Sequence, residues 1–355
     1  MYPMEIERLR QSLTAHGIFD PVREDLLSVE KAIAIESLAS VGAVTPPKYL
    51  QPNGGQRVRA ALLLLCARFA GSGGSRLAIQ LGAVVEMVHA ATLVHDDVVD
   101  MEQTRRGWPS ANVQSANRTC VLAGDWLYIR AFRVALEEGV LDLVIGVAQM
   151  MVVGELIQRD CIGITEAGCM ELVDRQTACL FSVCGKLGAV AAGADKRDGE
   201  KLGEFAWNVG MAFQLIGDML DFVSRDSTPG KQACGNLKDG KITLPLVYAL
   251  EQASVSERNL VAGVLRDRTY DAVPYVLALV DRYGGIQHTH ARARQFTDRA
   301  RQILAEFPDS LCRRALFTLT DLVTEGDCYG HDPGACERGV SARCAAAWQE
   351  ASKRD

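Results

Sequence analysis

The chain has 355 residues, of which 48% are apolar and 23% charged, and its formal net charge is −6. The apolar content excludes a disordered chain, and the mild negative charge does not support nucleic-acid binding as the main task. The length suits one large domain or two small ones. Apolar residues recur at three- and four-residue spacing, which predicts helices over residues 79–93, 119–136, 141–158, 172–191, 199–222 and 244–252. No alternating strand pattern is visible, so the sequence predicts an all-α bundle.

Membrane spans and disulfides are not expected. The longest wholly apolar run, near residues 60–65, is too short to cross a bilayer, and the N-terminus lacks the apolar core of a signal peptide. The 11 cysteines have no zinc-site spacing, and we predict that most are reduced core thiols of a cytoplasmic protein. We expect residues 1–325 to form the helical domain and residues 326–355 a loosely ordered tail. No role follows for the tail residues Cys328, Cys336 and Cys344.

An apolar helix ends in aspartates at VEMVHAATLVHDDVVD, residues 85–100. On a helix Asp96 and Asp100 share a face with His89, whereas Asp97 is turned aside by about 100°. Two carboxylates on one face are costly without compensation, and oxygen-only ligation suits Mg²⁺. The alternative is an acidic helix end that faces solvent.

Basic loops adjoin this acidic helix end. Arg105 and Arg106 follow it, and Arg57 and Arg59 follow a glycine pair upstream. Guanidinium groups beside metal-binding carboxylates make a good diphosphate site, because their planar fork matches phosphate oxygens. Each arginine pair taken alone is also consistent with a solvated surface.

A second acidic helix end lies in AFQLIGDMLD, residues 212–221. Gln214, Asp218 and Asp221 follow an i, i+4, i+7 pattern and share a helical face. Lys231 and Lys241 come shortly after it. Two acidic helix ends with basic loops suggest a metal-bridged diphosphate held between facing helices.

These motifs together resemble the trans-isoprenyl diphosphate synthases, and within them the long-chain polyprenyl diphosphate synthases of bacterial quinone biosynthesis. HDDVVD, AGDWLY, AFQLIGDMLD and DGKITLPLVYAL stand in the family's order and spacing, and the resemblance covers residues 24–325. It implies an all-α bundle around a deep apolar cavity, usually a homodimer. It also implies a Mg²⁺-dependent condensation of isopentenyl diphosphate with an allylic diphosphate such as farnesyl diphosphate.

The resemblance assigns roles residue by residue. Asp96, Asp97 and Asp100 match the first Asp-rich motif, and Asp218 with Asp221 matches the second. The positions implied to bind isopentenyl diphosphate are Gln56, Arg59, His89 and Arg106. The positions implied to bind the allylic diphosphate are Arg105, Gln176, Thr177, Gln214, Lys231 and Lys241. Among these side chains the resemblance implies catalytic roles for Asp96, Asp100, Arg105, Lys231 and Lys241.

Product length is expected to depend on the cavity below the first motif. An aromatic residue four or five positions before the motif closes this cavity in short-chain members of the family. Here Ala91 and Thr92 occupy those positions, which favours a long product. The alternative is that Ala91 is only a close helix contact and that the floor lies elsewhere, at Trp126 or Tyr128.

Four positions depart from the family pattern. Gln56 and Gln176 stand where lysines are usual, and Gly217 and Asn236 stand where aspartates are usual. Three hypotheses follow from these differences. The chain is a working polyprenyl diphosphate synthase with reduced activity, or a terpene cyclase or other prenyltransferase derived from the same fold, or a non-catalytic partner subunit of a heteromeric synthase.

Overall fold

The computed structural model describes residues 18–38, 57–71, 75–101, 104–105, 108–114, 116–158, 163–223, 235–238, 240–267 and 273–325. These residues are almost wholly helical, as predicted. The helices are η1 (Asp20–Val22), α2 (Arg23–Leu38), α3 (Val58–Ala70), α4 (Arg76–Val99), α5 (Ala111–Gln114), α6 (Asn117–Glu137), α7 (Leu141–Gln158), α8 (Glu166–Val173), η3 (Asp174–Ala178), α9 (Cys179–Ala192), α10 (Lys196–Val223), α11 (Gly235–Lys238), α12 (Leu244–Gln252), α13 (Val255–Asp267), α14 (Val273–Arg282), α15 (Gly285–Ala305) and α16 (Leu311–Glu325). Two short strands, β1 (Thr104–Arg105) and β2 (Trp108–Pro109), pair antiparallel.

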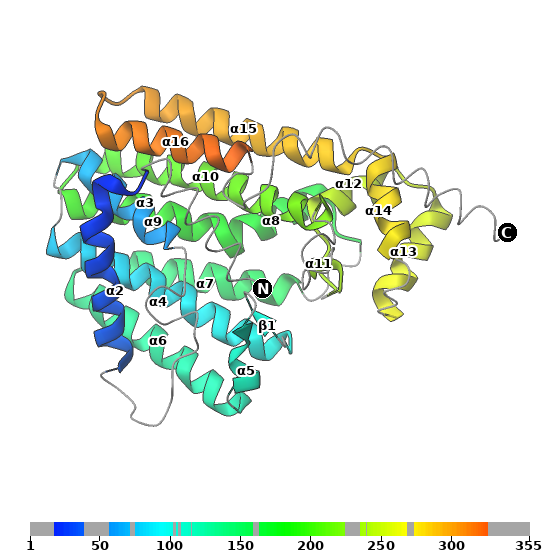
Figure 1. Ribbon diagram of the computed structural model, residues 1–355, viewed down its shortest axis with the longest axis horizontal. Helices are drawn as coiled ribbons and strands as arrows, with labels where there is room; N and C mark the ends of the chain where they lie inside the picture. The colour runs from blue at the N-terminus through cyan, green and yellow to red at the C-terminus, as the bar shows by residue number, and fades with distance from the viewer. Residues whose placement is uncertain are drawn as a thin grey trace.

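The long helices lie side by side in layers, with α15 and α16 along one edge and α6 along the other (Figure 1). Helix α9 lies at the centre and packs against α3, α4, α7 and α10. Helix α10 also contacts α15, and α4 also contacts α2 and α6. Figure 1 shows α13 and α14 at one end of the molecule, beyond α12. This arrangement brings α4, α7 and α10 around one interior region.

Glycines allow the central helix to approach its neighbours closely. A Cβ at Gly185 would lie 2.2 Å from the carbonyl oxygen of Leu202 in α10. A Cβ at Gly188 would lie 2.7 Å from the carbonyl oxygen of Leu63 in α3. Real Cβ atoms cannot come so near a backbone oxygen, so glycine at these positions fixes the spacing of the three helices.

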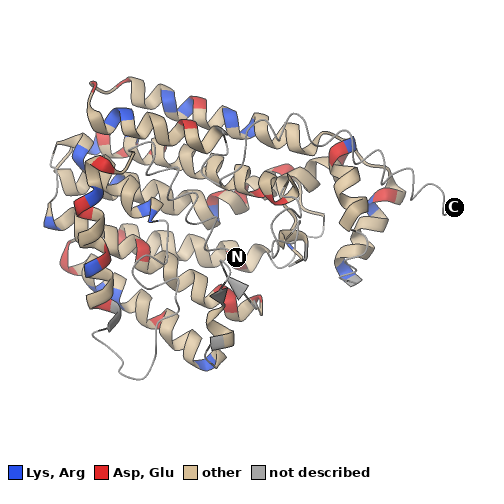
Figure 2. Ribbon diagram, viewed as in Figure 1, with Lys and Arg blue, Asp and Glu red and all other residues tan. Residues whose placement is uncertain are grey.

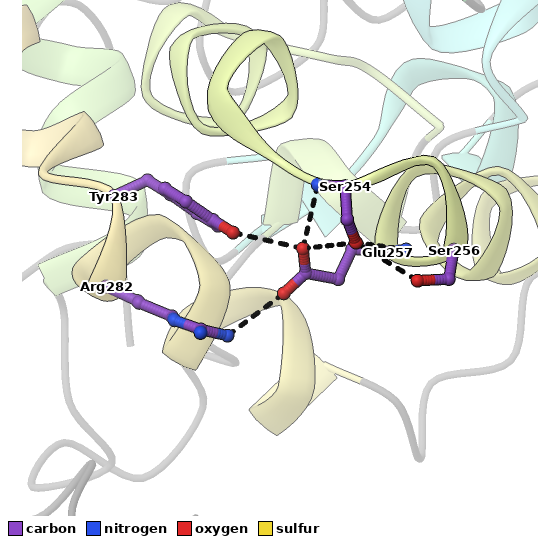
Figure 3. Close-up of polar contacts among 5 residues, drawn as sticks. All are labelled: Ser254, Ser256, Glu257, Arg282 and Tyr283. Atoms are coloured by element: carbon purple, nitrogen blue, oxygen red, sulfur yellow. Dashed lines mark hydrogen bonds and ion pairs between the residues drawn. The ribbon is translucent and has the colours of Figure 1, made fainter.

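Capping residues define several helix ends. The Ser75 hydroxyl accepts the Ala78 N–H at the start of α4. At the start of α13, Ser254 and Glu257 bond reciprocally, because Glu257 accepts the Ser254 N–H at 2.9 Å and the Ser254 hydroxyl accepts the Glu257 N–H at 3.3 Å. Arg282 and Tyr283 also donate to Glu257 at 3.0 Å each, which joins the end of α14 to this cap (Figure 3).

Both charge signs are scattered over the outer helices, including α2, α15 and α16 (Figure 2). Among the described residues, α4 and α7 are long and apolar enough to cross a membrane by length and composition. The apolar window of α4 is 67% buried in the protein interior, as in a core helix, whereas that of α7 is 28% buried. Helix α7 therefore presents apolar side chains on the surface.

The described cysteines are free thiols, in agreement with the prediction. Five are buried, and Cys312 is partly buried. Burial raises the pKa of the Cys66 and Cys184 thiols, which keeps them protonated and unreactive. The tail with its three cysteines lies outside the described residues, so the predicted division at residue 325 stays a prediction.

Candidate functional site

A cavity of about 230 Å³ lies between α3, α4, α7, α8, η3, α10, α11 and the segment that enters α12. Its lining combines polar and apolar side chains from these elements. They are Arg59, His89, Thr92, Leu93, Asp96, Met151, Glu155, Gln158, Cys169, Leu172, Val173, Gln176, Thr177, Gln214, Asp218, Asn236, Lys241, Ile242 and Thr243. Residues far apart in the sequence, predicted separately as site residues, thus line one cavity.

Helix α4 presents one face to this cavity. His89, Thr92 and Asp96 lie on it, as the helical spacing predicts. Asp97 lies on another side of the helix, where its fully buried carboxylate accepts the Ala111 N–H of α5 at 2.8 Å. Asp97 therefore secures the α4–α5 connection and does not line the cavity.

Lys241 joins the first acidic motif to the segment before α12. Its Nζ donates to Oδ2 of Asp100 at 2.7 Å, and both side chains are at most one-quarter exposed. Burial lowers the pKa of Lys241, but the bond to Asp100 and the charges of Asp100, Glu155 and Asp96 outweigh it and raise the pKa above its ordinary value. Lys241 is therefore a fixed cation among the cavity carboxylates.

Helix α10 contributes a hydrogen-bonded row. The Thr177 hydroxyl donates to Gln214 at 2.9 Å, and the Gln214 amide donates to Asp218 at 2.8 Å. Burial raises the pKa of Asp218 to about 7, and the charge of Asp221 adds to the effect, while Gln214 and Lys241 oppose it. The raised pKa means that the positive charge nearby is too weak to keep this buried carboxyl group ionised. Groups with strongly shifted pKa values are frequent at functional sites.

Asp221 lies one turn beyond Asp218 but does not line the cavity directly. Its two oxygens accept the N–H groups of Gly235 and Asn236 at 3.0 Å each, at the start of α11. Asn236 itself lines the cavity where the resemblance expects an aspartate. Asp221 thus fixes α11 against the cavity.

Gln176 and Thr177 lie in η3, a five-residue π-helix between α8 and α9. The sequence pattern predicts one continuous helix over 172–191, whereas in the structure this π-helix interrupts it. Single π-turns inside α-helices are frequent at functional sites, and here both neighbouring side chains reach the cavity.

Gln176 is held by two residues that the sequence analysis did not single out. Its amide donates to Glu155 at 2.8 Å and to Gln158 at 2.7 Å, both on α7. The sequence carries a weak signal for them, because Glu155 and Gln158 are polar residues near the end of a largely apolar helix. A carboxylate facing a cavity from such a helix is a candidate functional group.

Arg57 and Arg59, which follow the upstream glycine pair, lie in different environments. Arg59 lines the cavity, with its guanidinium 5.2 Å from the ring centre of Phe181. Arg57 does not line the cavity and instead forms ion pairs with Glu30 and Glu86. The suggestion that both arginines serve a diphosphate is therefore wrong for Arg57.

The two residues expected to set product length, Ala91 and Thr92, also lie in different environments. Ala91 is fully buried and does not line the cavity, whereas Thr92 does. The Thr92 hydroxyl lies 3.0 Å from the Tyr128 hydroxyl, and the Tyr128 ring packs against Phe132 with 5.7 Å between ring centres. The alternative reading, with Ala91 as a close helix contact and Tyr128 near the cavity wall, fits this geometry.

Several predicted residues cannot be placed. Gln56, Arg106 and Lys231 lie outside the described residues. The backbone of Arg105 lies in β1, but its side chain is not described. Their predicted roles stay predictions.

The carboxylates suit a hard divalent cation. Among the residues that the structure describes, no three His, Cys, Asp or Glu side chains form a complete metal cluster. Mg²⁺ commonly takes only one or two carboxylates and completes its shell with waters and substrate phosphates. Asp96 on α4 and Asp218 on α10, which line the same cavity, offer such donors. The pKa of Asp218 is high without a cation, and a bound cation would stabilise the ionised form of its carboxyl group.

Comparison with known proteins gives the class. The polyprenyl synthetase family model matches residues 43–280. An all-trans-nonaprenyl-diphosphate synthase (geranyl-diphosphate specific) from Rhodobacter capsulatus is 35% identical over 316 residues, which cover 87% of this chain and 97% of that protein. Heptaprenyl diphosphate synthase component 2 from Geobacillus stearothermophilus is 29% identical over 88% of this chain and 98% of its own length.

Solved structures agree. A polyprenyl synthase from Caulobacter crescentus CB15, crystallised with calcium and isoprenyl diphosphate, superposes with a TM-score of 0.79 at 30% identity, covering 90% of this chain and 97% of that one. The chain belongs to the polyprenyl synthetase family. It is a prenyltransferase with the all-α isoprenoid synthase fold, as the sequence motifs indicate.

Proposed function

We propose that this prenyltransferase condenses isopentenyl diphosphate with an allylic diphosphate such as farnesyl diphosphate, repeatedly, to make a long-chain polyprenyl diphosphate for quinone side chains. The observation that carries the proposal is the cavity in which carboxylates of α4 and α10 meet Arg59, His89 and Lys241. The similarity to a nonaprenyl diphosphate synthase supports the long product.

Asp96 and Asp100 on α4, with Asp218 and Asp221 on α10, are the residues that we expect to hold Mg²⁺. The bound ion supplies positive charge to the departing diphosphate. A divalent cation fits the donor set, and the Caulobacter structure was crystallised with calcium.

The chain's own side chains then position two substrates. Lys241, Thr177 and Gln214 bind oxygens of the allylic diphosphate, while Arg59 and His89 hold isopentenyl diphosphate. The allylic C–O bond breaks with its electron pair going to the diphosphate, and the isopentenyl double bond attacks the resulting allylic carbon. A proton then leaves the new chain for the released diphosphate. Apolar residues such as Leu93 and Met151 exclude water, which would quench the cationic carbon.

The departures from the family pattern reduce the positive charge and the carboxylate count of the site. Gln176 supplies no charge, and Gly217 supplies no ligand. Removing one preorganised electrostatic contact costs roughly 10²–10³ in rate, and losses within one network do not add. We therefore propose a slow synthase that is nevertheless catalytic.

The test is an assay of purified protein with labelled isopentenyl diphosphate, farnesyl diphosphate and Mg²⁺, with products sorted by length. A ladder of long prenyl diphosphates supports the proposal. A hydrocarbon or alcohol formed without isopentenyl diphosphate would instead identify a terpene cyclase. Turnover that appears only after a second synthase is added would identify a partner subunit, and the likeness to heptaprenyl diphosphate synthase component 2 is the reason to test for one.

We further propose that the protein is a cytoplasmic homodimer joined through α6 and α7. Both helices carry apolar stripes on the surface, and Leu122, Ile129, Leu136 and Leu156 are each at least 59% exposed. Residues 122, 129 and 136 are seven apart and share one face of α6. Exposed apolar stripes on adjoining helices are typical of an interaction surface.

The oligomer can be tested by light scattering after gel filtration. Leu156→Glu is expected to convert a dimer to a monomer. Leu260→Glu is the matched control, because Leu260 is 47% exposed on the distant α13. A monomeric wild-type protein would contradict the proposed dimer.

A further inference from the structure

The backbone at Arg57, just before α3, is in a conformation that L-residues rarely adopt. Its φ is 50° and its ψ is 29°, in the left-handed region. Among the described residues, only Arg57 and Met101 are non-glycine residues with positive φ. Such strained positions persist only where surrounding contacts hold them, and they gather at functional sites.

Two carboxylates, the buried Glu86 and the partly buried Glu30, hold Arg57 in place. Its Nε donates to Oε1 of Glu30 at 2.6 Å and its Nη2 to Oε2 of Glu30 at 3.1 Å, which is a two-pronged contact. Its Nη1 donates to Oε2 of Glu86 at 3.3 Å. The three side chains are 10%, 16% and 5% exposed, respectively. Only a planar guanidinium can make this set of bonds at once.

Glu86 also holds the first turn of α3. Its second oxygen, Oε1, accepts the Ala60 N–H at 3.1 Å. One α4 side chain therefore binds the side chain of Arg57 and the backbone of Ala60. Helix α3 begins between these two contacts, so its first turn is fixed relative to α4.

Arg59 lies between the two fixed positions. It is the α3 residue that lines the cavity, and its guanidinium lies over Phe181. Helix α4 carries His89 one turn after Glu86, and Asp96 further on. The clamp on Arg57 and Ala60 thus sets where Arg59 stands relative to these two cavity residues.

We propose that Arg57, clamped by Glu30 and Glu86, is a positioning residue that directs Arg59 into the cavity and so sets the affinity for isopentenyl diphosphate. This inference rests on the proposed function, in which Arg59 binds that substrate. Arg57 itself does not line the cavity and does not contact the substrate.

The test compares Arg57→Lys with a matched control on the same pair of helices. Arg57→Lys keeps the charge and loses the fork. Arg68→Lys also removes a guanidinium contact, because Arg68 of α3 donates to one oxygen, Oδ2, of Asp25 in α2 from Nε at 2.9 Å and from Nη2 at 2.7 Å. Arg68 lies about two and a half turns along α3 from Arg59, so its loss affects the contact between α2 and α3 without touching the first turn.

Steady-state kinetics should separate the two. We expect Arg57→Lys to raise KM for isopentenyl diphosphate at least tenfold with little change in KM for farnesyl diphosphate. Arg68→Lys should leave both KM values within twofold of wild type. Thermal melting of each variant shows that it is folded. An Arg57→Lys protein that is folded and has an unchanged KM for isopentenyl diphosphate overturns the inference.

A double substitution shows whether Arg57 acts through Arg59. In an Arg59→Met background, Arg57→Lys should have no further effect on KM, since the residue that it positions is gone. Full additivity of the two substitutions overturns the inference. If Arg59→Met leaves KM for isopentenyl diphosphate unchanged, the proposed role of Arg59 is wrong. If the wild type does not turn over isopentenyl diphosphate, the proposed function is wrong. Either result also overturns the inference about Arg57.

Discussion

The substitution Gln176→Lys would restore the cation that the family pattern places in the cavity. Gln176 lies in η3, and its amide nitrogen is 2.8 Å from a carboxylate oxygen of Glu155. A lysine there would place an ammonium group within reach of both Glu155 and a diphosphate. We expect kcat/KM for the allylic diphosphate to rise.

The size of the rise follows from the two partners of the new charge. A preorganised charge-assisted contact to a developing anion contributes roughly 2–4 kcal/mol. The Glu155 carboxylate lies 2.8 Å from the Gln176 amide nitrogen, so it would neutralise part of the new lysine charge. About half of the contribution then remains effective, roughly 1–2 kcal/mol. Since each 1.36 kcal/mol corresponds to a tenfold change in rate, we expect a rise of about tenfold.

The assay is initial-rate turnover of farnesyl diphosphate and isopentenyl diphosphate by wild type and variant. Gln176→Met is the control, because it has a similar length and no charge, and it should not raise the rate. Adding Glu155→Gln to Gln176→Lys should raise the rate further, because the lysine charge is then no longer neutralised. A folded Gln176→Lys protein with no gain in kcat/KM would refute this account of the site.

Three other predictions follow from packing, burial and the cavity wall. Gly185→Ala should destabilise the protein by roughly 1–3 kcal/mol in denaturant unfolding, because its Cβ would strike α10, whereas Gly146→Ala, with nothing within 4 Å, should stabilise it slightly. Burial raises the pKa of Asp218 to about 7, so the folded metal-free protein keeps a proton that the unfolded chain releases near pH 4. The free energy of unfolding should therefore fall by up to roughly 4 kcal/mol as pH rises from about 4 to about 7. Asp218→Asn should remove this part of the pH dependence in unfolding curves taken across that range. Tyr128→Ala should lengthen the product in chain-length analysis, while Tyr128→Phe, which keeps the ring, should leave the length unchanged; equal product lengths in both would place the length limit elsewhere.

Much of the fold could be predicted because the central helices are rich in apolar residues, along one face in α9 and α10 and on all sides in α7. The predicted ranges 141–158 and 244–252 coincide with α7 and α12, and 199–222 lies within α10. Helix α15 lies outside the predicted ranges because small or polar residues such as Thr289, Ala293 and Thr297 occupy much of its buried face, although the spacing of that face is regular. Helix α13 was missed too, although Ser254 and Glu257 form a capping signature three residues apart.

The site residues could be predicted where their spacing places them on one face of a helix. They could be predicted less well where contacts between helices determine which side chains reach the cavity. His89 and Asp96 share a face of α4 and both line the cavity. Arg57 and Arg59 look equivalent in the sequence, but carboxylates on two other helices take Arg57 away from the cavity. Glu155 stands in no motif, because the only other carboxylate of α7 is Asp142 in its first turn, so only its position near the end of a largely apolar helix marks it.

The π-helix η3 has a consequence for how this chain can change over time. It accommodates one more residue per turn than the α-helices on either side of it. Deleting one residue there would restore a regular α-helical turn and leave α9 in register with α8, so Gly185 and Gly188 would still face α10 and α3. A single deletion within residues 174–178 should therefore preserve the core and change only the side chains that this turn presents to the cavity, such as Gln176 and Thr177. A deletion in the regular α-helical part of α9 would instead rotate the residues after it by about 100° and disrupt their packing.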